Sequence, residues 1–123
     1  MANGDARTVK GIPVRAVPAY NLAKNYHPKG VGNGYVLTLG KKHLYVAGDT
    51  ENTPEMKGLK GIDIAFLPMN LPYTMTPEMA ADAALAFRPK ILYPYHFGET
   101  DTAKLSKLLA AAPDIEVRIR PMK

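Results

Sequence analysis

Apolar and polar positions alternate over two neighbouring segments in the first half of the chain and predict a β-hairpin. Residues 34–39 and 43–47 are rich in Val, Leu and Tyr, and Gly40-Lys41-Lys42 separates them. A glycine beside two polar residues suits the positive φ angle of a tight turn. An earlier strand is predicted at residues 12–17, and its proline indicates that it is short or near a sheet edge. Residues 18–34 contain two prolines and three glycines, so we expect a long irregular loop there.

From residue 53 onward the pattern changes to alternating helices and strands. The tetrapeptide Thr-Pro-Glu-Met occurs at residues 53–56 and again at residues 76–79. Each copy has the chemistry of a helix start, with threonine as N-cap, proline at the first helical position and a carboxylate near the positive end of the helix. The first helix should end near Gly58 or Gly61, and the second should run from Pro77 to Phe87 and stop before Pro89.

The remaining segments complete a mixed sheet. Strands are predicted at residues 62–67, 91–93 and 115–119, and a third helix is predicted at residues 102–112. Helical crossovers make the later strands parallel, whereas the N-terminal hairpins are antiparallel. The predicted fold class is α/β, at the α+β boundary, with helices on one face of one mixed sheet. The other face carries Val, Ile and Leu, and it needs a cover because such side chains avoid water.

Composition fits one soluble domain over residues 1–123. Apolar residues make up 46% of the chain and charged residues 22%, which argues against disorder. No apolar run is long enough to span a membrane, and the polar N-terminus is unlike a secretory signal, so we expect a cytoplasmic protein. The net charge of +5 comes from scattered Lys and Arg, a pattern that does not favour a nucleic-acid surface. With no cysteine, disulfides and thiolate metal sites are excluded.

Three polar residues directly follow predicted parallel strands. They are Asp49, Asn70 and His96, and the carboxyl ends of parallel strands meet at one sheet edge, where ligands bind. Asp49 and His96 are metal-competent. Each residue also has a structural explanation: a turn or helix cap for Asp49, a packed ring for His96 and loop hydrogen bonds for Asn70. The residues alone favour these structural explanations.

Four further candidates lie in loops near this edge. His27 and Asn21 lie in the long loop of residues 18–34, where a histidine is more often plain surface than a ligand. Tyr73 and Met75 follow Asn70, and they are expected to wall a pocket or to cover the core.

Three segments resemble a known family in order and spacing. Val46-Ala47-Gly48-Asp49-Thr50, residues 65–77 and Tyr93-Pro94-Tyr95-His96 are similar to the C-terminal half of a metallo-β-lactamase-fold hydrolase, in the branch of ascorbate-phosphate lactonase-like and other metal-dependent hydrolases. The resemblance covers the chain from Val14 onward. It implies that Asp49 bridges two metal ions and that His96 binds one of them, with zinc, manganese or iron as the metal.

The chain also departs from this family. The His-x-His-x-Asp-His motif of the family's N-terminal half is absent. A ligand histidine usually follows the strand that corresponds to residues 14–17, and Asn21, a weak ligand, lies there instead. His27 from the same loop becomes the substitute. Zinc takes about four ligands, and this chain offers two or three. No catalytic residue and no organic cofactor site is identified.

The family fold is a four-layer αββα sandwich of two similar halves, so this chain resembles one half-domain. Its bare sheet face predicts a homodimer of C2 symmetry or a complementary N-terminal half as partner. The resemblance implies metal-dependent hydrolysis of an ester, lactone or phosphoester in a small-molecule substrate, once a partner supplies the missing ligands. The alternative is a metal-free structural or interaction half-domain that self-associates.

Overall fold

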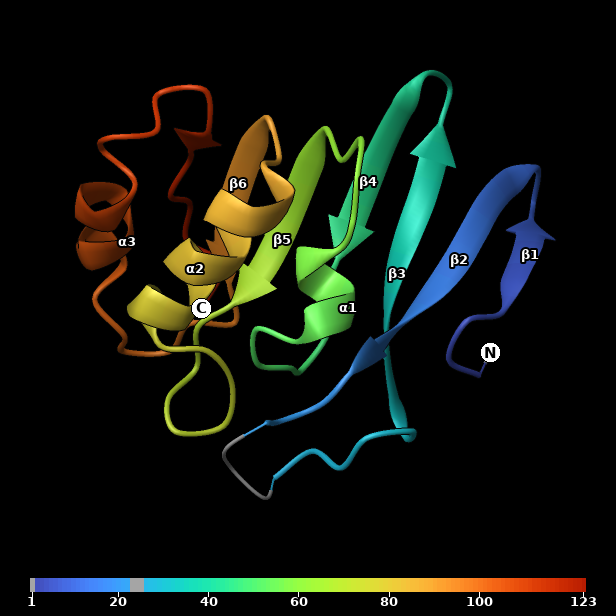
Figure 1. Cartoon of the computed structure of the whole chain (residues 1–123), viewed down its shortest axis with the longest axis horizontal. Coiled ribbons are helices and arrows are strands. Elements are labelled where there is room, and N and C mark those ends of the chain that lie inside the picture. The colour runs from blue at the N-terminus through green and yellow to red at the C-terminus, as the bar shows by residue number, and fades with distance from the viewer. Residues whose placement is uncertain (1, 23–25) are drawn as a thin grey trace.

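A computed structural model describes residues 2–22 and 26–123 as one seven-stranded sheet in which the strand order follows the chain (Figure 1). The strands are β1 (Ala6–Val9), β2 (Ile12–Ala19), β3 (Gly32–Leu39), β4 (Lys42–Val46), β5 (Ile64–Pro68), β6 (Ile91–Tyr95) and β7 (Glu116–Val117). Strands β1 to β4 pair antiparallel, and β4 to β7 pair parallel. The predicted α/β class with a mixed sheet is confirmed.

Three helices cover one face of this sheet. They are α1 (Pro54–Lys57), α2 (Pro77–Phe87) and α3 (Thr102–Leu108), and Figure 1 shows them on the same side of the strands. The row of side chains beneath them is buried and comprises Val36, Tyr45, Ala65 and Leu92. Because cross-strand partners share one face of a sheet, this row belongs to the core between sheet and helices. None of the helices in the described ranges is long and apolar enough to cross a membrane.

The opposite face of the sheet is apolar and only partly buried. Two rows of paired side chains run across β3, β4, β5 and β6: Leu37, Leu44, Ile64 and Ile91 in one, and Tyr35, Val46, Phe66 and Tyr93 in the other. The rings of Phe66 and Tyr93 stack with their centroids 5.1 Å apart. No described helix covers these rows (Figure 1).

The repeated tetrapeptide starts two helices, as predicted. The Thr53 hydroxyl accepts a hydrogen bond from the Met56 N–H, and the Thr76 hydroxyl accepts one from the Met79 N–H, both over 3.1 Å. Helix α2 has the predicted bounds. Its C-cap is Arg88, whose φ of 50° lies in the left-handed region. Each cap satisfies a donor that the helix itself leaves unpaired.

Other predicted bounds were wrong. Strand β1 was not predicted because all four of its residues are exposed, and Lys10 and Gly11 form its tight turn at φ 50° and 80°. Strand β2 lies next to the edge strand but is not short. It continues through Pro18 along β3, because Pro18 lies beyond the end of β1 and needs no backbone N–H to pair with that strand. Helix α3 ends early at Leu108, ahead of Pro113. Strand β7 has two residues instead of the predicted five.

Replacing the N-cap of α2 should destabilise the fold. We expect Thr76→Ala to lower the free energy of unfolding by ~1 kcal/mol, because the Met79 N–H loses its acceptor. Chemical denaturation followed by circular dichroism measures this change. Thr76→Ser, which keeps the hydroxyl, serves as control and should lie within ~0.5 kcal/mol of the unmodified chain. Equal losses in the two variants would contradict a capping role.

Candidate metal centre

Asp49 lies just beyond the end of β4, on a turn that requires glycine. Gly48 has a φ of 73°, and a Cβ at this position would lie 2.6 Å from the carbonyl oxygen of Asn33. The Gly48 N–H donates a hydrogen bond to the Tyr95 hydroxyl over 3.0 Å. This turn directs the Asp49 carboxylate outward at the sheet edge, where its side chain is 51% exposed.

Asp49 lies between two histidines from distant parts of the chain. Its Oδ2 is 3.4 Å from Nε2 of His27, which comes from the loop between β2 and β3. Its Oδ1 is 3.7 Å from Nε2 of His96, which follows β6. The two carboxylate oxygens therefore face different imidazole rings.

Asn21 fixes the orientation of the His27 ring. Its Oδ1 is 2.8 Å from Nδ1 of His27, and an amide oxygen only accepts, so Nδ1 is the donor. In the neutral ring, Nε2 then carries an unshared electron pair that faces the Asp49 carboxylate. Two acceptors in this arrangement are stabilised by a cation between them, which is either a proton on Nε2 or a metal ion.

The loop after Asn70 supports the His27 side of the site. The Asn21 side-chain amide donates to the carbonyl oxygen of Tyr73 over 3.0 Å. The Tyr73 and Tyr26 rings meet edge to face with centroids 4.9 Å apart. Asn21 and Tyr73 therefore hold the loop that carries His27, on the Nδ1 side of its ring.

His96 is held in an unusual backbone conformation. Its φ of 48° lies in the left-handed region, which non-glycine residues seldom adopt outside turns and functional sites. Its N–H donates to the carbonyl oxygen of Met122 over 2.7 Å, so the C-terminal segment supports it. The side-chain amide of Asn70 lies 3.4 Å from Nε2 of His96. Asn70 therefore stands beside His96, as Asn21 stands beside His27.

Met75 and His43 lie away from this edge. Met75 is completely buried in the core cluster, so it covers the core and does not line the open edge. His43 is exposed at the other end of β4, away from Asp49.

A cavity of about 240 Å³ opens beside the His27 side of the centre. Its lining residues are Ala19, His27, Pro28, Val31, Gly32, Asn33 and Asp49.

Burial raises the pKa of the nearby Tyr95, the Gly48 N–H opposes this shift, and the Asp49 carboxylate adds to it. Tyr95 therefore stays neutral near pH 7 and supports the turn without adding charge.

The separations between these donors match part of a metal site. Two ligands that lie ~2.0–2.1 Å from a tetrahedral ion are about 3.3–3.4 Å apart, close to the observed 3.4 Å between His27 and Asp49. Across residues 2–22 and 26–123, no three His, Asp or Glu side chains converge closely enough to hold one ion. Asp49 with either histidine therefore offers two donors, and an ion held there would need further ligands.

The fold is that of metallo-β-lactamase-fold proteins. Residues 1–97 match the family of beta-lactamase superfamily domains, and the chain belongs to that family. A candidate metal-dependent hydrolase from Parabacteroides distasonis is 51% identical, with a TM-score of 0.96 over 100% of this chain and 57% of its own. The metallo hydrolase Igni18 of Ignicoccus hospitalis is 26% identical, with a TM-score of 0.80 over 98% of this chain and 56% of its own. The resemblance stated from the sequence is confirmed.

Curated relatives are longer than this chain. The UPF0173 metal-dependent hydrolase of Ligilactobacillus salivarius is 42% identical over 87 residues, which are 68% of this chain and 39% of that protein. The chain spans about half the length of the relatives that it matches.

Sequence reasoning missed the residues that join the site to the core. The buried Thr50 hydroxyl accepts a hydrogen bond from the Tyr20 N–H and donates to the Tyr20 carbonyl oxygen, both over 3.0 Å. This pair ties the His27 loop to the Asp49 turn. The signal for Thr50 was its place in Gly48-Asp49-Thr50, but its partner is 30 residues away. Tyr95 was missed because its role depends on the neighbouring Gly48 turn.

The Gly48 turn can be tested by comparing two glycine variants. Gly48→Ala should lower the free energy of unfolding by ~3 kcal/mol for two reasons. The added methyl group would clash with the Asn33 carbonyl oxygen, and alanine is strained at a positive φ. Gly61→Ala is the matched control, since Gly61 has a φ of 69° but nothing within 4 Å of an added Cβ. It should lose only ~1 kcal/mol, as measured by urea denaturation. Equal losses would show that the close approach at Gly48 is unimportant.

Proposed function

We propose that this chain supplies the Asp49, His27 and His96 ligands of a two-metal hydrolytic centre, with Asp49 shared between the ions. The single observation that carries the proposal is that the two Asp49 oxygens face two different histidines, at 3.4 Å and 3.7 Å. A shared carboxylate is a common device for holding a pair of ions. Membership of the superfamily and similarity to metal-dependent hydrolases support a divalent metal here.

The donor types decide which metals suit this centre. Imidazole nitrogens and carboxylate oxygens bind zinc, manganese and iron, and the chain has no thiolate to favour a softer ion. Asn21 accepts a hydrogen bond from Nδ1 of His27 and thereby turns Nε2 toward Asp49. Metal-binding histidines are commonly oriented by such a hydrogen bond at the other ring nitrogen. We therefore propose zinc as the first metal to test, followed by manganese and iron.

The reaction that suits this centre is hydrolysis of an ester, lactone or phosphoester. Bound ions would supply Lewis acidity to the scissile bond and lower the pKa of the attacking water. Asp49 and the two histidines would fix the positions of the ions, and Asn21 would fix the His27 ring through Nδ1. The cavity beside His27 is walled by Ala19, Pro28 and Val31, so it accommodates a small apolar group of the substrate.

Metal binding by the isolated chain is the direct test. Calorimetric titration of Zn²⁺ into chelator-treated protein should show binding that weakens at least about tenfold in His27→Gln and in Asp49→Asn, since each variant removes a donor. Asn21→Ala should weaken binding ~10–100-fold, because Nδ1 of His27 loses its acceptor.

His43→Gln is the matched control, because His43 is exposed and remote from Asp49. Its zinc affinity should equal that of the unmodified chain. Zinc binding that survives Asp49→Asn and falls in His43→Gln would refute the proposed centre. Binding too weak to detect in every variant would favour the metal-free alternative, in which a protonated His27 pairs with Asp49.

We also propose that a complementary polypeptide covers the outer sheet face. A second sheet that packs here and brings further ligands would explain three features together. These are the two apolar rows, the incomplete ligand sets and the alignment of this chain to only 57% of its relative from Parabacteroides distasonis. A second copy of this chain would cover the face but would bring only the same donors. We therefore assign the face to a chain that corresponds to the unmatched part of the relatives.

Co-expression tests this assignment. The part of the Parabacteroides distasonis protein outside the alignment should form a 1:1 complex with this chain, as measured by light scattering after gel filtration. Phe66→Lys should abolish the complex, because it places a charge in the centre of the apolar rows. Leu85→Lys, on the exposed side of α2, should leave it intact. A stable homodimer that excludes the added polypeptide would contradict the assignment and identify a second copy as the cover.

A further inference from the structure

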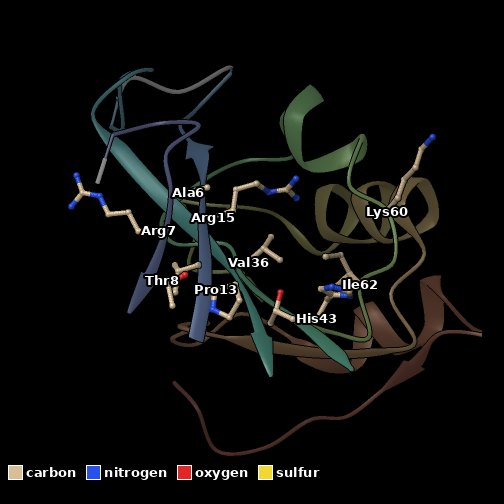
Figure 2. Close-up of a pocket in the computed structure, with 11 residues that line it drawn as sticks. Ala6, Arg7, Thr8, Pro13, Arg15, Val36, His43, Lys60 and Ile62 are labelled. Carbon is tan, nitrogen blue, oxygen red and sulfur yellow. The ribbon is translucent and has the colours of Figure 1, made fainter. Parts of the chain in front are cut away.

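A second cavity lies on the helix side of the sheet, over the N-terminal strands that no helix covers. It has a volume of about 530 Å³, within the usual range for ligand pockets (Figure 2). Its lining residues are Ala6, Arg7, Thr8, Pro13, Val14, Arg15, Val36, Thr38, His43, Lys60 and Ile62. His43 and Asp49 are six residues apart along and beyond β4, so the two sites are separated by roughly 20 Å.

The lining of this cavity is cationic. It contains Arg7, Arg15, His43 and Lys60, and no aspartate or glutamate. Figure 2 shows Arg15 reaching over the cavity toward the segment that carries Lys60 and Ile62, whereas the charged ends of the Arg7 and Lys60 side chains point away from Arg15. An anion in this cavity would therefore meet Arg15 first.

Arg15 and Lys60 are available to a ligand. Neither forms an ion pair within the described ranges, unlike Arg7, which lies 3.9 Å from Asp5. A second hollow of about 450 Å³ is lined by the same Arg15 and Lys60, so these two cations stand where the two spaces join.

The carboxylates around these spaces are already engaged. Asp63 accepts a hydrogen bond from the His43 backbone N–H over 2.8 Å and pairs with Lys90 over 3.3 Å. Glu55, which lines the second hollow, accepts a hydrogen bond from the Tyr20 hydroxyl over 2.6 Å. Both carboxylates keep their negative charge, but neither forms an ion pair with Arg15 or Lys60.

The rest of the lining indicates the kind of anion. Pro13, Val36 and Ile62 offer an apolar surface, and the Thr8 and Thr38 hydroxyls are hydrogen-bond donors. A guanidinium, an ammonium and two hydroxyls suit the several oxygens of a phosphate group better than a carboxylate alone. We propose that this cavity binds a small organic phosphomonoester, with the phosphate at Arg15 and Lys60 and the apolar body over Val36 and Ile62.

Phenyl phosphate is the probe for this site, because it combines a dianionic phosphate with an apolar ring. Titrated into metal-free, chelator-treated protein, it should shift the backbone amide NMR signals of Thr8, Thr38 and His43. Arg15→Gln and Lys60→Gln should each weaken its affinity about tenfold, since each removes a charge-assisted hydrogen bond. Benzoate, with one charge, should bind at least about fivefold more weakly than phenyl phosphate.

Arg120→Gln is the matched control, because it removes the same charge from an exposed side chain that lies outside the lining of the cavity. It should leave the affinity within about twofold of the unmodified chain, and the thermal midpoints of all three variants should agree. Equal weakening in Arg120→Gln and Arg15→Gln would overturn the proposal, since it would indicate diffuse attraction. Shifts confined to residues 48–50 and 96 would also overturn it, by placing the probe at the Asp49 edge. Failure here leaves the metal-binding test unaffected.

Discussion

The close backbone approach of β3 to the end of β4 is the constraint on which the candidate site depends. A Cβ on Gly34 would lie 2.4 Å from the Ala47 carbonyl oxygen, and one on Gly48 would lie 2.6 Å from the Asn33 carbonyl oxygen. Two glycines let the chains pack backbone to backbone, so β4 turns sharply where β3 begins. This turn places Asp49 beside the loop that carries His27. Asp49 and His27 come close together because Gly34 and Gly48 have no side chains.

The proposed second sheet would complete two features of the chain. The apolar outer rows lack a covering layer, and each histidine beside Asp49 accounts for only one further donor. In a sandwich of two sheets, one interface buries both apolar faces and brings loops from both halves to a common edge. In the proposed arrangement, burial of the sheet and completion of the ligand set would therefore be coupled. The basic cavity lies on the other side of the sheet and does not depend on that interface.

Features set by local chemistry could be predicted from the sequence. The N-caps Thr53 and Thr76 and the bounds of α2 depend on residues within one turn of each other. The alternation of apolar residues gave the two faces of the sheet and the need for a cover. Strand β1 could not be predicted, because its four residues are exposed and only their pairing with β2 makes them a strand. The length of β2 was missed for a similar reason, since the partner strand decides whether a proline is tolerated.

The sequence by itself determined the donor types, the order of strands and helices, and the position of Asp49 and His96 after their strands. Only the tertiary structure decided that His27 faces Asp49 and that Asn21 supports the ring instead of replacing it as a ligand. The loop that carries His27 has no periodic pattern, so its path follows from distant contacts such as Thr50 with Tyr20. Short-range propensities are encoded in neighbouring residues, whereas the meeting of loops at a sheet edge depends on packing across the whole domain.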